Sequence, residues 1–110
     1  MKTILVHGVP DTPQMWQPLI DALAEHGHTD LSAPALPGFT SPAPAGFDCT
    51  KEAYVGWLVA QMEAAGEPVN LVGHDWGALL VVRAASLRPD LVRSWAVANA
   101  LPERSYKWHR

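Results

Sequence analysis

The sequence of 110 residues lacks several features that mark particular classes of protein. It has one cysteine, Cys49, so no disulfide can form within the chain. It has no uncharged apolar run near the roughly 20 residues of a membrane-spanning helix, and the residues after Met1 predict a strand instead of a signal peptide. Positive charge is scarce, with 8 Lys and Arg against 11 Asp and Glu. We therefore expect a cytoplasmic protein that binds neither nucleic acid nor a membrane.

What is present is an ordinary globular composition. Hydrophobic residues make up 48% of the chain and charged residues 17%, and the net charge is −3. These proportions predict a packed core and exclude disorder, collagen and coiled coils. The length predicts about one domain.

The apolar pattern alternates between strand-like runs and helical periodicity. Short aliphatic runs predict strands at residues 3–6, 28–35, 69–73 and 91–98, the second of them polar enough for a sheet edge. Helical spacing predicts a first helix that starts near Gln17, a second that ends at Gly66, and a third over residues 77–88. The order βαβαβαβ predicts an α/β fold with a parallel sheet and helices on its faces.

Two motifs directly follow predicted strands, at the edge of a parallel sheet where ligands bind. The first is His7-Gly8-Val9-Pro10 and the second is Gly73-His74-Asp75-Trp76-Gly77. The second has the form of a nucleophile elbow, Gly-x-nucleophile-x-Gly, in which the tight turn leaves no room for side chains at the two glycines. Asp75 is then predicted to project above the sheet as a nucleophile. The alternative is that Asp75 merely caps the helix that follows it.

Together with Leu36-Pro37-Gly38-Phe39 after the second strand, these motifs resemble the α/β-hydrolase family. The resemblance is to the aspartate-nucleophile branch, which contains epoxide hydrolases and haloalkane or haloacetate dehalogenases, and it covers essentially the whole chain. It implies the strand order second, first, third, fourth. It also implies that the family fold continues past Arg110 with a lid, further strands, an acid and a histidine base. We therefore expect residues 1–110 to be the N-terminal portion of a hydrolase domain, truncated before the lid and without turnover on its own.

The resemblance also implies a mechanism for a small-molecule substrate. The Asp75 carboxylate, which needs no base to remove a proton first, would attack an electrophilic carbon and form an alkyl ester. The backbone N–H groups of Val9 and Trp76 would form the oxyanion hole for hydrolysis of that ester, and the Trp76 indole would hold a halide or polar substrate atom. Gly8, Gly73 and Gly77 would shape the two turns. We assign no cofactor and no metal.

Three functions follow from these motifs. Epoxide hydrolysis is the first, because Val9 lacks the polar side chain that haloalkane dehalogenases usually carry at that position. A haloalkane or haloacetate dehalogenase is the second. The third is a noncatalytic α/β module that binds a small ligand or completes its sheet with a partner chain. The oligomeric state is left open by the sequence.

Other conspicuous residues receive structural interpretations. His26 and His28 have the spacing of a metal site but no further ligands nearby, so we expect them on the surface. His109 follows the fourth strand instead of the last one of the family fold, so it is not assigned as the base. Trp16, Trp57 and Trp95 are expected to pack in the core.

Overall fold

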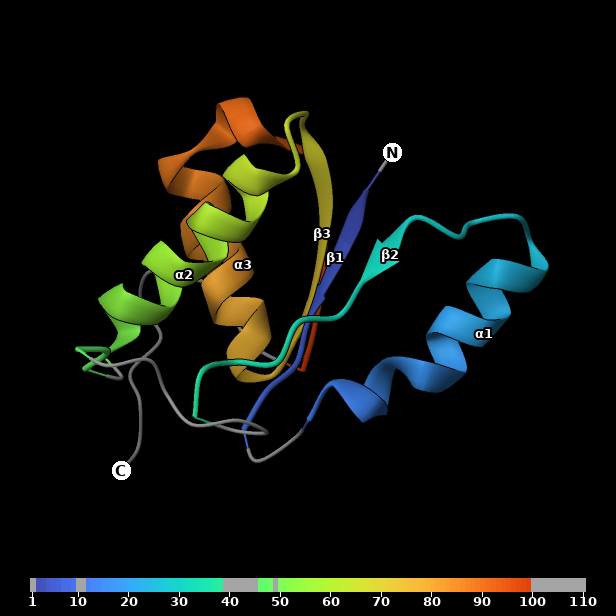
Figure 1. Ribbon diagram of the computed structural model, residues 1–110, viewed down its shortest axis with the longest axis horizontal. Coiled ribbons are helices and arrows are strands. Elements are labelled where there is room, and N and C mark those ends of the chain that lie inside the picture. Colours follow the sequence, from blue (N-terminus) through green and yellow to red (C-terminus); the bar gives the residue numbers. More distant parts are fainter. Residues whose placement is uncertain (1, 10–11, 39–45, 49, 100–110) are drawn as a thin grey trace.

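The structure is a computed structural model and describes residues 2–9, 12–38, 46–48 and 50–99. Strands and helices alternate as the sequence predicts (Figure 1). The strands are β1 (Thr3–Val6), β2 (Leu31–Ser32), β3 (Val69–His74) and β4 (Val92–Ala98). The helices are α1 (Gln17–Glu25), α2 (Lys51–Ala64) and α3 (Trp76–Leu87), with short 3-10 turns η1 (Pro13–Trp16) and η2 (Pro89–Leu91).

The four strands form one parallel sheet in the order β2-β1-β3-β4, which confirms the predicted fold class and strand order. Thr3 of β1 lies beside Leu31 of β2 on one side and Asn70 of β3 on the other. Because all strands run the same way, their carboxyl ends meet at one edge of the sheet. The residues after β1, β3 and β4 are therefore brought together there.

The hydrophobic core lies between the sheet and the pair α2 and α3, which cover one face (Figure 1). Side chains of the central strands β1 and β3 form the side of this core that belongs to the sheet. Leu58 and Met62 of α2 are completely buried against it, as the helical spacing of this segment predicts. This packing fixes β1, β3 and α3, the three elements that carry the candidate site.

The first helix lies on the other side of the sheet from α2 and α3, beyond β2 (Figure 1). Its start matches the predicted start near Gln17, and Gly27 beyond its end has a φ of 86° that suits glycine. None of its residues is buried, and Leu19 on its apolar face is 38% exposed. The sequence pattern thus predicts the helix correctly, yet this helix contributes little to the described core.

The two outer strands depart from their predicted forms. The second strand is predicted over residues 28–35, but β2 has only two residues. Its position at the sheet edge is confirmed. The fourth strand begins at Val92 instead of Leu91 because the preceding residues form the 3-10 turn η2. In both cases the predicted strand includes residues that lie in turns or in irregular segments of the structure.

The prediction of a core position is wrong for one of the three tryptophans. Trp16 is 7% exposed and Trp57 packs against the core, but Trp95 is 49% exposed. The physical reason is its place on β4, an outer strand of the sheet whose residues are mostly exposed. In the described sheet, β4 is an edge strand that exposes the Trp95 side chain.

A side-chain cap stabilises the start of α2, and removal of this cap should destabilise the protein. Thr50 Oγ1 accepts a hydrogen bond from the Ala53 N–H at 3.1 Å, and the same hydroxyl donates to Asp48 Oδ1 at 2.8 Å. We expect Thr50→Ala to lower the free energy of unfolding by about 1 kcal/mol, as measured by urea titration. Thr50→Ser keeps both hydrogen bonds and serves as the control. An alanine variant as stable as the serine variant would contradict the cap.

The same cap has a definite pH dependence. The backbone N–H and the hydroxyl of Thr50 donate to the Asp48 carboxylate and hold its pKa below the usual value of 3.8. A lowered folded-state pKa means that this stabilisation is present above the unfolded pKa and is lost as the pH falls through the folded pKa. The difference in stability between the wild type and Thr50→Ala should accordingly shrink in strong acid.

Candidate active site

Asp75 forms the whole connection between β3 and α3. Its φ of 57° and ψ of −120° lie outside the regions that a non-glycine residue normally adopts, so the turn is strained. Its N–H donates to Ala98 O of β4 at 3.0 Å, and its own carbonyl accepts from Ala78 N–H of α3 at 3.0 Å. These two bonds hold Asp75 at the carboxyl edge of the sheet.

Glycines stand where the backbones around this turn come closest. A Cβ on Gly73 would lie 2.5 Å from Gly77 O, and a Cβ on Gly77 would run into Val6 O of β1. A Cβ on Gly8 would lie 2.6 Å from the Cβ of Asp75. Real Cβ atoms do not approach so closely, so all three positions require glycine. Because these glycines have no Cβ, the turn after β1 can lie directly against the turn at Asp75.

The Asp75 carboxylate faces that neighbouring turn. The Val9 N–H donates to Asp75 Oδ2 at 3.3 Å, although the two residues are 66 positions apart in the sequence. Within the described residues, the Asp75 side chain makes no capping hydrogen bond to α3, so the capping alternative is wrong. The two strand-end motifs therefore meet in space, with the carboxylate of one at the backbone donor of the other.

The surroundings of the carboxylate combine positive potential with apolar side chains. Trp76 is the first residue of α3, where backbone N–H groups have no partner inside the helix and the helix dipole favours a negative charge. The side chains of Val9 and Trp76 are 41% and 40% exposed. These exposed apolar side chains belong to the two turns that meet at Asp75, and the Val9 N–H is the backbone donor that reaches its carboxylate.

Asn99 is a residue at this edge that the sequence patterns do not single out. It follows β4 directly, has a φ of 62°, and its Nδ2 donates to His74 Nε2 at 3.0 Å. This bond ties the ring of His74, at the end of β3, to the residue that follows β4. The sequence feature that could have identified Asn99 is its position directly after a strand. An asparagine there tolerates positive φ and lies at the ligand-binding edge of the sheet.

Other predicted features lie elsewhere. His26 and His28 are exposed beyond the end of α1, as expected. Among the residues that the structure describes, no group of three or more His, Cys, Asp or Glu side chains could hold a metal ion. Nor is any described helix long and apolar enough to cross a membrane. Cys49 and His109 lie outside the described residues.

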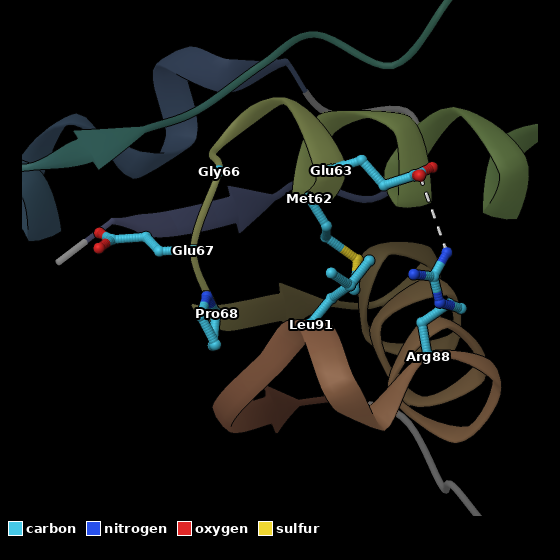
Figure 2. Close-up of a pocket in the computed structure, with 7 residues that line it drawn as sticks. All are labelled: Met62, Glu63, Gly66, Glu67, Pro68, Arg88 and Leu91. Carbon is cyan, nitrogen blue, oxygen red and sulfur yellow. Dashed lines mark ion pairs between the residues drawn. The ribbon is translucent and has the colours of Figure 1, made fainter.

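A hollow of about 340 Å³ opens at the opposite edge of the sheet. Figure 2 shows Glu63 and Arg88 facing each other across one side of it, joined by an ion pair at 3.8 Å. Pro68, which precedes β3, forms another part of its wall, so the hollow is at the amino end of the strands. Since ligands of parallel sheets bind at the carboxyl ends, we place the candidate site at Asp75 and not here.

The chain is similar to hydrolases with several different names. It is 30% identical to the (E)-2-((N-methylformamido)methylene)succinate hydrolase of Acinetobacter baylyi, over 94% of this chain and 39% of that one. It is 32% identical to a haloalkane dehalogenase of Mycolicibacterium paratuberculosis, over 96% of this chain and 38% of that one. Its structure resembles the crystal structure of an epoxide hydrolase from Vigna radiata with a TM-score of 0.79 and 30% identity, over 90% of this chain and 33% of that one.

The chain therefore spans less than two fifths of the length of each of these proteins. The sequence model of the alpha/beta hydrolase family matches residues 3–108, which is nearly the whole of this chain. That range includes all four strands of the sheet, the connection at Asp75 and the turn after β1. The chain belongs to the alpha/beta hydrolase family.

Proposed function

We propose that Asp75 is the nucleophile of a hydrolase that forms an alkyl ester with a small-molecule epoxide. The observation that carries this proposal is the contact between Asp75 Oδ2 and the Val9 N–H at 3.3 Å. A carboxylate that served only to cap the start of α3 would accept a hydrogen bond from the first turn of that helix, and this one does not. The similarity to a Vigna radiata epoxide hydrolase supports the choice of substrate class.

The first step follows from the two oxygens of the carboxylate. Oδ1 attacks an epoxide carbon, a new C–O bond forms, the ring C–O bond breaks, and the released alkoxide takes a proton from water. Oδ2 becomes the carbonyl oxygen of the new ester. It already lies beside the Val9 N–H, so no rearrangement of the aspartate is needed before the next step.

In the second step, water adds to the ester carbonyl carbon, and negative charge develops on Oδ2. The N–H groups of Val9 and Trp76 are proposed to stabilise that charge as an oxyanion hole. A general base must activate the water. We propose that residues 1–110 are the N-terminal portion of the hydrolase domain, since the relatives are much longer, and that the base lies outside them. The chemistry is expected in the cytoplasm, an expectation that rests on the sequence alone.

A haloalkane or haloacetate dehalogenase is the second candidate, favoured by the similarity to a Mycolicibacterium paratuberculosis haloalkane dehalogenase. Asp75 would then attack the carbon that bears the halogen, and the carbon–halogen bond would break with release of halide. An ester of Asp75 again results, but it lacks the hydroxyl group that opening of an epoxide leaves on the neighbouring carbon. The two candidates differ in what leaves and in the mass that the protein gains.

Covalent labelling of the chain tests the proposal and separates the candidates. After incubation with an aryl epoxide such as styrene oxide, we expect the peptide that contains Asp75 to gain the mass of the whole epoxide. A bromoalkane would instead add only its alkyl group and release bromide. The measurement is peptide mass spectrometry, with a bromide assay in parallel.

Two variants control for nonspecific reaction of carboxylates. Asp75→Asn should not be labelled, whereas Asp21→Asn, which removes an exposed carboxylate on α1, should be labelled like the wild type. If the folded chain is labelled at Asp75 by neither reagent, the nucleophile assignment is wrong. That result would favour the noncatalytic module.

A further inference from the structure

His7 is a fully buried polar side chain next to the candidate site that the proposed chemistry leaves without a role. It directly follows β1 and has no solvent exposure. Its Nδ1 lies 2.9 Å from Gly8 O, and its Nε2 lies 3.0 Å from the backbone nitrogen of Leu36. The ring is therefore fixed at both nitrogens, between the turn after β1 and the chain after β2.

These two contacts determine the tautomer of the ring. The Leu36 N–H can only donate, so His7 Nε2 must accept. A carbonyl oxygen can only accept, so His7 Nδ1 must carry a proton and donate it to Gly8 O. Only the tautomer with its proton on Nδ1 satisfies both bonds.

The bond to Gly8 O controls the direction of the Val9 N–H. The Gly8 carbonyl and the Val9 N–H belong to the same planar peptide unit and point in opposite directions in the trans form. Fixing the oxygen therefore fixes the N–H, which donates to Asp75 Oδ2 at 3.3 Å. Glycine permits many backbone conformations, so the peptide after Gly8 needs such a constraint.

The ring is supported in turn by the hydrophobic core. Leu36 is 2% exposed and belongs to that core, so its N–H is a rigid donor to His7. The next residue, Pro37, is held from α2 because the Tyr54 hydroxyl donates to Pro37 O at 2.8 Å. A continuous series of contacts thus runs from α2 through His7 to the turn that faces Asp75.

We propose that His7 is a positioning residue, which orients the Gly8–Val9 peptide so that the Val9 N–H faces Asp75. The inference rests on the proposed roles of Asp75 and Val9 in ester hydrolysis. The bond from His7 also polarises the peptide and strengthens the Val9 N–H as a donor. In this role His7 touches no reacting atom.

Two substitutions separate the two hydrogen bonds of the ring. His7→Asn places an amide near the position of Nδ1 and keeps a donor for Gly8 O, but it does not reach Leu36. His7→Gln reaches toward Leu36 with an acceptor and has no donor at the Nδ1 position. We expect hydrogen-exchange protection of the Val9 amide to fall about tenfold in His7→Gln, the equivalent of one lost hydrogen bond, and to stay near the wild-type value in His7→Asn.

The amide of Leu71, buried in β3, is the internal control because its protection reports global unfolding. Equal loss at Val9 and Leu71 in both variants would mean that His7 only stabilises the fold, and the inference would be overturned. Nitrogen NMR of the wild-type ring needs no variant and gives a second test. A proton on Nε2 instead of Nδ1 would also overturn it.

Labelling of Asp75 distinguishes this inference from the proposed function. If the epoxide labels Asp75 while the Val9 amide is indifferent to the His7 variants, the positioning role fails and the nucleophile stands. If Asp75 is never labelled but Val9 protection follows the Nδ1 donor, His7 does orient the peptide, and the proposed function fails.

Discussion

Replacement of Gly77 by alanine should cost about 4 kcal/mol or more in the free energy of unfolding, an exceptional loss for one methyl group. The added Cβ would run into Val6 O and would lie 2.7 Å from His7 O. Both are backbone atoms of the segment that begins with β1, so relief of the clash requires that α3 move away from the sheet. Urea unfolding followed by circular dichroism measures the loss.

The same change at Gly56 is the matched control. Gly56 lies inside α2, is exposed, and would have nothing within 4 Å of an added Cβ. Gly56→Ala should therefore stabilise the protein by about 0.5–1 kcal/mol, because alanine is the better helix former. If Gly77→Ala lowered the free energy of unfolding by no more than a few tenths of a kcal/mol, that result would contradict the close packing of α3 on β1.

The second large effect is expected in the core. Leu58→Ala should destabilise the chain by about 2–5 kcal/mol, because Leu58 is completely buried and its removal leaves a cavity between α2 and the sheet. The measurement is again the free energy of unfolding in urea. The unfolding transition should keep its slope, which would show that the variant loses stability and not compactness.

Leu19→Ala makes the same chemical change on the partly exposed face of α1. Leu19 is 38% exposed, and we expect its replacement to cost no more than about 0.5 kcal/mol. If the two variants lose similar amounts of stability, the apolar face of α1 is packed in solution as tightly as the core. That result would contradict the description of α1 as peripheral.

Much of the fold follows from local patterns in the sequence. The bounds of β1 match the predicted run at residues 3–6, and α1 and α3 lie where the helical spacing predicts them. The reason is that side-chain period and turn residues act over a few positions, so a short window contains the information. The Gly-x-Asp-x-Gly elbow is predictable for the same reason, since a tight turn without room for Cβ atoms needs glycine at fixed offsets.

The sequence alone thus determined an α/β chain with a parallel sheet, its strand order through the family resemblance, and Asp75 as the residue to inspect. The bond from the Val9 N–H to Asp75, in place of a cap on α3, becomes apparent when the chain is folded. The same is true of the exposure of Trp95 and of the two contacts by which His7 joins Gly8 O to the Leu36 N–H. Each of these outcomes depends on which distant segments lie within a few ångströms of one another, and side-chain periodicity carries no such distances.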